Sequence, residues 1–303
     1  MKNTDYADVG DCCMNLETSQ RPSLSSSQIA QFKRDGFLFP IPVLRDDEVE
    51  RYSSSCRDVY RHLKQHLGRP AGHLQQAHLH FKWAYNLATN ASILDVVESL
   101  IGPDFLIAHS VIFFKENRSQ QRIAWHYDAG PVAALKIDRS DECVVAWVAL
   151  TDSDIDNGCV QMLPGSHLVK DQDFEKAGGG YSTRGASQDI AADQADAVPV
   201  ILNPGTMSLH HVNVIHGSHE NKSARDRIGM SFLYSSTRTH LSLQHLKVLL
   251  ARGKDSYGYY QLLDQPPGDS IEKGIQEQRD YWRRQRVLWN VKGGANQIME
   301  FYD

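Results

Sequence analysis

The middle of the chain, from Phe105 to Ser235, is a series of short apolar runs that turn-forming residues separate. The longest apolar run of the sequence, Cys143 to Leu150, has eight residues, whereas a membrane-spanning helix needs about 20. Runs of this length, rich in β-branched and aromatic residues and separated by DNG, PGS, NPG and HGS, are typical of β-strands. Many short strands in succession favour an antiparallel sandwich or barrel. The predicted strands are 105–115, 143–151, 159–165, 198–202, 206–215 and 227–235.

Helical periodicity precedes and follows this β-rich part. Residues Ser25 to Ser27 offer N-caps for a first helix that Gly36 ends, and the apolar, proline-containing segment 36–44 is expected to be extended. Apolar residues at helical spacing then predict a longer helix from Asp46 to Gly68 and a third over residues 92–101. From residue 239 helical periodicity returns, and the basic, aromatic stretch 278–290 is expected to be an amphipathic helix packed on the sheet.

The 303 residues suit one large domain preceded by a tail. Residues 1–23 are polar and aperiodic, so we expect a loose tail, followed by a single domain over 24–303. Segment 170–197, rich in Gly, Ser, Asp and Ala, is expected to be a lid. The remaining parts of the domain are a helical lead-in over 24–102, a β core over 103–236 and a C-terminal helical segment over 239–303.

The composition excludes several classes of protein. Lys and Arg number 32 against 37 Asp and Glu, so the formal charge is −5, which argues against binding to nucleic acid or to an anionic membrane. The N-terminus lacks the apolar region of a secretory signal. The five cysteines include no CxxC pair, so neither a disulfide framework nor a zinc ribbon is expected, and the cytoplasm is the simplest location. The oligomeric state stays open.

One sequence motif, AWHYDAG, predicts a metal site. It places His126 and Asp128 at positions i and i+2, which share one face if they lie on a strand. His216, at the end of a predicted strand, is the best third ligand, with His210 and His211 as rivals. Two histidines and one carboxylate on one face of an octahedral ion are the arrangement of non-haem Fe(II) oxygenases, whereas zinc prefers tetrahedral sites. With 14 histidines in the chain, a chance HxD and a purely structural His126 remain alternatives.

The sequence around this motif resembles the phytanoyl-CoA dioxygenase family of Fe(II)- and 2-oxoglutarate-dependent oxygenases. The NGC…PGSH and HxSxxNxS…R blocks carry the resemblance, whereas residues 1–22 and those beyond about 240 have no comparable match. It implies a mainly β fold with flanking helices and a double-stranded β-helix (jelly-roll or cupin-like) core. It also implies Fe(II), 2-oxoglutarate and O₂ as cofactor and cosubstrates, with His126, Asp128 and His216 as iron ligands. The similar segments are 26–40, 94–115, 125–131, 146–167 and 204–234.

The same resemblance implies four residues for binding the cosubstrate. Arg227 lies eleven residues after His216, where the family has the arginine for the distal carboxylate of 2-oxoglutarate, and a guanidinium matches a carboxylate bidentately. Arg225 is the nearby competitor, which we expect at the surface. Ser218 fits the HxS position and would donate its hydroxyl to that carboxylate. Trp147 near the cosubstrate and Lys115 paired with a carboxylate complete the set, against the alternatives of a core aromatic and an exposed lysine.

The resemblance implies an oxidoreductase that acts on a small molecule and releases succinate and CO₂. Halogenases that resemble this family lack the carboxylate ligand, so Asp128 favours hydroxylation of an unactivated C–H bond. The expected substrate is an amino-acid-derived or specialised, natural-product metabolite, and positions to inspect are Tyr127, Arg122, Lys136 and His109. Desaturation, cyclisation or epoxidation with the same cofactors, and a non-catalytic metal-binding protein of this fold, are the alternatives.

Overall fold

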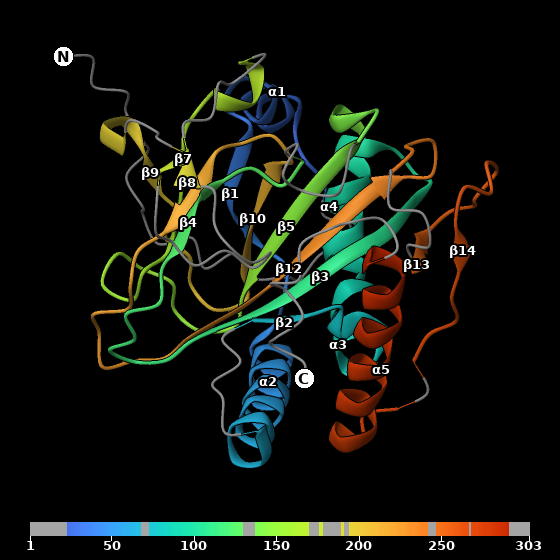
Figure 1. Ribbon diagram of the computed structural model, residues 1–303. Helices are drawn as coiled ribbons and strands as arrows, with labels where there is room; N and C mark the ends of the chain where they lie inside the picture. Colours follow the sequence, from blue (N-terminus) through green and yellow to red (C-terminus); the bar gives the residue numbers. More distant parts are fainter. Residues whose placement is uncertain are drawn as a thin grey trace.

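A computed structural model describes most of the chain (Figure 1). The described residues are 23–67, 73–129, 137–169, 176–177, 189–190, 194–241, 247–266 and 268–290. The expected tail and most of the expected lid therefore lie outside them, as does Lys136. Within the described residues, no helix combines the length and the apolar character that crossing a membrane requires.

The helices before the β core begin and end where local sequence signals place them. Ser25 accepts a hydrogen bond from the backbone N–H of Gln28, whose side chain accepts one from the backbone N–H of Ser25, and Gly36 ends the helix with φ of 84°. The described helices are α1 (Ser26–Asp35), α2 (Asp46–Leu67), α3 (Lys82–Ala88), α4 (Ala91–Ile101) and α5 (Ile271–Asn290). The sequence analysis did not predict α3. A short 3₁₀ turn, Ala77–Leu79, precedes this helix.

The β core contains two sheets that face each other. In the large sheet the strand order is β1-β10-β5-β12-β3-β13-β14, with β2 also paired to β3. In the small sheet the order is β4-β11-β6-β9. The strands of the large sheet are β1 (Phe37–Pro42), β2 (His73–Gln75), β3 (Phe105–Lys115), β5 (Cys143–Ala149), β10 (Thr206–His211), β12 (Arg227–Ser236), β13 (Lys247–Arg252) and β14 (Gln261–Leu262). Those of the small sheet are β4 (Ile123–His126), β6 (Val160–Met162), β9 (Val198–Pro199) and β11 (His216–Ser218), while β7 (Lys176–Ala177) and β8 (Asp189–Ile190) pair separately.

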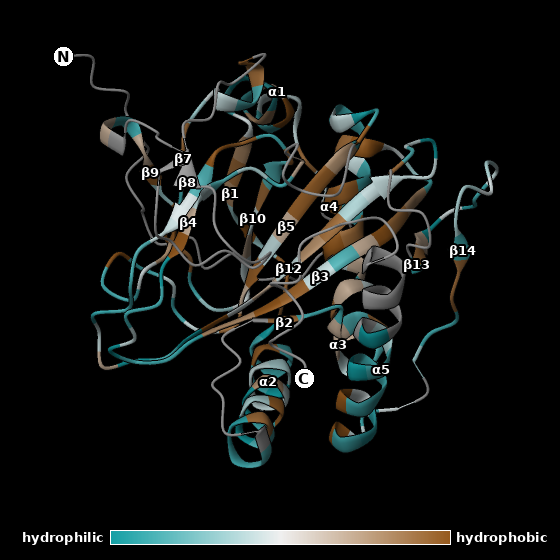
Figure 2. Ribbon diagram, viewed as in Figure 1, coloured by the Kyte–Doolittle hydropathy of each residue, from teal (hydrophilic) through white to brown (hydrophobic). Residues whose placement is uncertain are grey.

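The central strands β5 and β12 of the large sheet are buried on both faces, by helices on one side and largely by the small sheet on the other. Residues that alternate along β5 and β12, such as Val148 and Phe232, belong to the main core together with α2, α3 and α4. On the other face, Trp147 packs with Val160 and Met162 of the small sheet. Figure 1 places α3, α4 and α5 together on one side of the large sheet. Figure 2 shows brown, hydrophobic segments in β3, β5 and β12, with hydrophilic or intermediate colours in the middle of β3 and at the end of β12.

The predicted strands of the large sheet are confirmed, with one exception. Predicted strand 206–215 is two strands in different sheets, because β10 ends at His211, the N–H of Val214 donates to the carbonyl of His211 at 2.9 Å, and β11 begins at His216. The chain thus crosses from the large sheet to the small one within a short turn.

The prediction of helix throughout 239–303 is wrong for its first part. Strand β13 lies there, and its Leu249 and Leu250 pair with β3, so helix α5 begins only at Ile271. A short apolar run such as VLLA is compatible with either a helix or a strand. Here it forms a strand because its backbone pairs with β3. The predicted helix 278–290 lies within α5, where the side chain of Gln278 donates to the backbone carbonyl of Gln75 in β2.

Candidate active site

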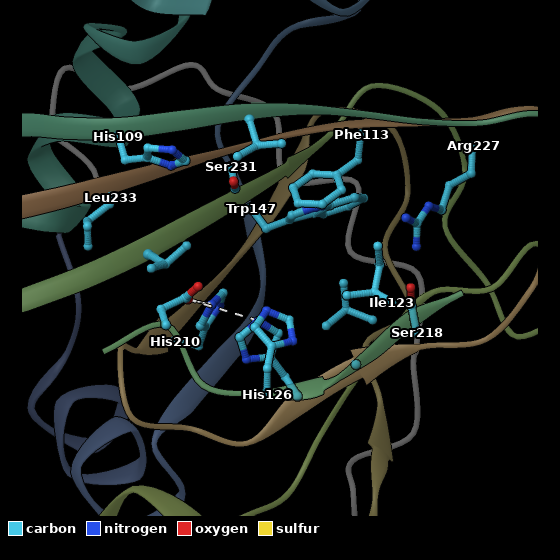
Figure 3. A pocket seen from close by; sticks show the side chains of 16 residues that line it. His109, Phe113, Ile123, His126, Trp147, His210, Ser218, Arg227, Ser231 and Leu233 are labelled. Atoms are coloured by element: carbon cyan, nitrogen blue, oxygen red, sulfur yellow. Dashed lines mark hydrogen bonds and ion pairs between the residues drawn. The ribbon is translucent and has the colours of Figure 1, made fainter. Parts of the chain in front are cut away.

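A cavity between the two sheets collects most of the residues that the sequence analysis selected. Alternate residues of β3, β5 and β12 point into it from the large sheet, and β4 and β11 close it from the small sheet (Figure 3). We call the large-sheet side the inner face. Its cavity-lining residues are His109, Val111, Phe113, Val145, Trp147, His210, Arg227, Ser231 and Leu233.

Cross-strand pairing brings the two predicted histidine ligands together. His216 on β11 is the register partner of His126 on β4, and their rings lie 4.3 Å apart between centroids. Ligand atoms of His126, Asp128 and His216 all lie within 4.8 Å of one another, and these three residues form the one such group among the described parts of the chain. We call them the metal group.

Each of the two imidazoles has the tautomer that a metal requires. Nδ1 of His126 lies 2.7 Å from the carbonyl oxygen of Ala124, and Nδ1 of His216 lies 2.9 Å from that of Val214. Because a carbonyl only accepts, both Nδ1 atoms carry the proton, which leaves Nε2 as the atom of each ring that can bind a metal. Burial, and then the neighbouring His126, lower the pKa of His216 to about 3, which keeps that imidazole neutral.

Asp128 reaches the group in a different way from the one its spacing suggested. Strand β4 ends at His126, so Asp128 lies in the following turn and not on the strand. The backbone N–H groups of Asp128 and Ala129 donate to the carbonyl of Val212 at 2.8 and 3.0 Å, which fixes this turn against the end of β10. The carboxylate oxygen Oδ2 lies 4.0 Å from Nε2 of His216.

The rival ligands of the sequence analysis lie outside this group. His210 lines the cavity and contacts Asp128 at 3.3 Å, whereas His211 pairs with Asp141 at 3.1 Å and does not line the cavity. Of the positions proposed to face a substrate, His109 lines the cavity, and Arg122 and Tyr127 are not among its lining residues.

Two buried basic side chains, Lys115 and Arg227, lie side by side at one end of the cavity. Arg227, which lines the cavity, begins β12 and is the register partner of Lys115 at the end of β3. Lys115 Nζ donates to the hydroxyl of the lining residue Ser218 at 2.9 Å, and both cations donate to the carbonyl of Gly158. Burial, and then Arg227, lower the pKa of Lys115 to about 6, and burial lowers the pKa of Arg227 to about 10. We call this part of the cavity the cationic end.

Neither cation has an ion pair with a carboxylate of the described residues, and Nε of Arg227 has no hydrogen-bond partner there. An uncompensated buried charge is costly, and the lowered pKa of Lys115 beside Arg227 reflects that cost, so this end of the cavity suits an anionic ligand. The expected rival, Arg225, is half exposed and pairs with Asp152 and Asp154.

Trp147 packs beside the buried Arg227, and Gly229 on the neighbouring strand β12 leaves the space that its ring occupies. Its ring centroid lies 5.4 Å from Cζ of Arg227. A Cβ at Gly229 would lie 2.1 Å from Cζ2 of Trp147, so the absence of a side chain there lets the indole lie over β12. Trp147 is therefore both a core aromatic and a wall of the cavity.

The HxSxxNxS block forms a loop that contacts the cationic end, where Nδ2 of Asn221 donates to the backbone carbonyl of Lys115 at 3.3 Å. Nδ2 of Asn221 donates to the carbonyl of Arg225 at 2.7 Å, and its Oδ1 accepts from the backbone N–H of Ser223 at 3.0 Å. These bonds are those of a turn-forming residue.

The phytanoyl-CoA dioxygenase (PhyH) family profile matches residues 32–229, about two thirds of the chain, which include the metal group and the whole cationic end. The chain belongs to the phytanoyl-CoA dioxygenase family. Fe(II) and 2-oxoglutarate are the cofactors of enzymes of this family, which are oxidoreductases.

Among curated relatives, human peroxisomal phytanoyl-CoA dioxygenase is 28% identical over 162 residues, which are 52% of this chain and 48% of the human protein. The chain thus matches about half the length of that relative. Ectoine dioxygenase of Halomonas elongata is 24% identical over 238 residues, 70% of each chain.

Solved structures agree with this fold. The non-heme monooxygenase ThoJ has a TM-score of 0.71 and 29% identity, covering 88% of this chain and all of ThoJ. CytC3 with Fe(II) and alpha-ketoglutarate has a TM-score of 0.60 and 21% identity, covering 83% of this chain and 97% of CytC3, and supports the double-stranded β-helix fold.

The residues present fit both cofactors of the family. Two imidazoles and a carboxylate are a donor set for Fe(II). The cationic end, with the orphaned Nε of Arg227, suits the distal carboxylate of 2-oxoglutarate.

Sequence reasoning missed two features of the cavity. It treated His210 only as a rival ligand, and it did not single out Ser231, which lies on the inner face between Arg227 and Leu233. The alternation of side chains along β12 and β10 was the signal that could have found both.

Proposed function

We propose that this chain is a non-haem Fe(II)- and 2-oxoglutarate-dependent dioxygenase that hydroxylates an unactivated C–H bond of a small molecule. The observation that carries the proposal is one cavity that combines the His, Asp, His metal group with two buried cations at one end. We further propose that residues 24–303 form one catalytic domain.

In this proposal His126, Asp128 and His216 bind Fe(II) and leave three coordination positions open. When bound, the metal would supply the activation of O₂, with one oxygen atom going to succinate and the other to the substrate as a hydroxyl group, while CO₂ is released. The backbone carbonyls that hold the two Nδ1–H groups turn both Nε2 atoms toward the metal position.

Arg227, Lys115 and Ser218 bind the distal carboxylate of 2-oxoglutarate in this proposal. The guanidinium and the ammonium offer donors from the large sheet, and the hydroxyl of Ser218 offers one from the small sheet. Trp147 forms the wall beside them and excludes water from the pair.

The substrate would lie at the opposite end, near His109, Ser231 and Leu233. Leu233 is the register partner of His109 and of Val145, so one cross-strand row combines an imidazole with two apolar side chains. Asp128 and Arg227 are the charged residues among the described ones that line the cavity, and the proposal assigns both to the metal and the cosubstrate. Within the predicted class, this supports a specialised metabolite with few charges more than an amino-acid-derived one that keeps its charged groups.

The cysteines support a cytoplasmic location. Cys56, Cys143 and Cys159 are buried and free in the described part of the chain. Burial raises the pKa of the Cys159 thiol to about 11, so this group stays protonated near the cationic end.

The experiment is a substrate screen with purified, Fe(II)-loaded protein, reading succinate and product mass together. A gain of one oxygen atom, dependent on Fe(II) and 2-oxoglutarate and absent in His126→Ala, is the expected result. Loss of two hydrogens would instead indicate desaturation or cyclisation. Full activity of His126→Ala, or metal binding without succinate release for any substrate, would contradict the proposal.

A further inference from the structure

We propose that His210 is a positioning residue for Asp128, and that its Nε2–H holds the carboxylate in the orientation in which it binds the metal. This inference rests on the proposed function, because it assumes that Asp128 is a metal ligand. His210 comes from the large sheet, whereas the two histidines of the metal group come from the small sheet.

The contact between the two side chains is buried and directional. Nε2 of His210 lies 3.3 Å from Oδ2 of Asp128, and the histidine side chain is 4% exposed. Figure 3 shows His210 among the side chains that line the cavity. Because an ionised carboxylate only accepts, the proton lies on Nε2. Nδ1 of His210 is buried without a hydrogen-bond partner among the described residues, so Asp128 is the group that orients this ring.

Asp128 is restrained in a different way from the other two ligands. His126 and His216 are oriented by backbone carbonyls within their own strands or directly before them. Asp128 lies in a turn, where backbone pairing fixes its Cα but not its side-chain torsions. The end of β10 contributes two restraints on Asp128: the carbonyl of Val212, which directly follows the strand, binds its backbone, and His210 contacts its carboxylate.

His210 lies beside the metal group without joining it. Its ring centroid is 4.7 Å from that of His216, yet the set of ligand atoms within 4.8 Å of one another consists of His126, Asp128 and His216. Its register partner on β5 is Val145, at the substrate end of the inner face. This geometry makes His210 a hydrogen-bond partner of the Asp128 carboxylate. Residues just outside a metal site commonly orient its ligands through such hydrogen bonds.

The test measures the affinity for Co(II), a redox-stable probe for the Fe(II) site, by calorimetric titration of the full chain without 2-oxoglutarate. His210→Leu removes the donor and should weaken binding about 10- to 100-fold. His210→Gln keeps an N–H donor and should recover most of that loss. His240→Leu is the control, because His240 is exposed and its ring contacts Tyr259 away from the cavity, and it should change the affinity by no more than about twofold.

A double-mutant cycle separates positioning from direct ligation. In the Asp128→Ala background, His210→Leu should cause no further loss, since its target is gone. Wild-type affinity in His210→Leu, or an undiminished loss in the Asp128→Ala background, would overturn the inference. If the wild-type chain itself binds no Co(II), the proposed function fails instead, so the two failures are distinguishable.

Discussion

The two sheets of the core contribute to the site in different ways. The large sheet places Lys115, Trp147 and Arg227 on long strands, at fixed cross-strand positions, with both faces of its central strands buried. The small sheet places His126 and His216 on strands of three or four residues, and Asp128 lies beyond the end of one of them. The cationic end is thus built by strand register, and the metal group by turns and hydrogen bonds.

This difference separates two functions that can be perturbed one at a time. Changes on the small sheet should remove metal binding and leave the fold intact. Changes on the inner face of the large sheet should alter cosubstrate binding or stability and, away from His210, leave the metal affinity intact.

The largest effect is expected from the small sheet. His216→Ala removes a ligand, so Co(II) affinity should fall by at least about 100-fold, more than for loss of an outer partner, and succinate release should stop. Thermal unfolding of the metal-free variant should stay close to that of the wild type. Retained metal affinity would show that the metal group has been wrongly assigned.

The next effect separates the large sheet from the small one. Arg227→Gln removes a buried charge, which costs about 2–5 kcal/mol where a charged partner is bound, so KM for 2-oxoglutarate should rise by roughly 30-fold or more. Metal affinity should not change. Arg225→Gln, at a half-exposed arginine, is the control; an equal rise there would contradict the assignment of Arg227.

A third change tests the packing of the large sheet alone. Gly229→Ala puts a Cβ into the ring of Trp147 and should lower the free energy of unfolding by about 1–3 kcal/mol, measured in urea. Gly268→Ala is the control, because nothing lies within 4 Å of its added Cβ. Equal stability of the two variants would mean that the indole moves away at no cost.

The smallest effect is a pH dependence. Because the pKa of Lys115 is lowered to about 6, the lysine is charged before and after carboxylate binding below that pH. Above it, binding requires uptake of a proton, so affinity for 2-oxoglutarate should fall as pH rises, by at most about tenfold per unit. Lys115→Met should abolish this slope, whereas Lys64→Met, at an exposed lysine, should not.

The same contrast explains what the sequence could predict. Strands of the large sheet carry their own periodicity, so 105–115 is predicted to the residue. Strands β4 and β11 are too short for an alternation and exist because their backbones pair with each other. The contact between His210 and Asp128 joins residues 82 positions apart in the chain, and Asp128 lies in a turn. The spacing of residues along the sequence cannot reveal such a contact.

The most direct test of the two-part site is an anaerobic titration of Fe(II)-loaded protein with 2-oxoglutarate, followed by the visible charge-transfer absorption of the chelate. We predict this absorption in the wild type, its loss in His216→Ala, and its appearance in Arg227→Gln only at roughly 30-fold higher 2-oxoglutarate or more. Absorption in His216→Ala, or an unchanged midpoint in Arg227→Gln, would contradict the account.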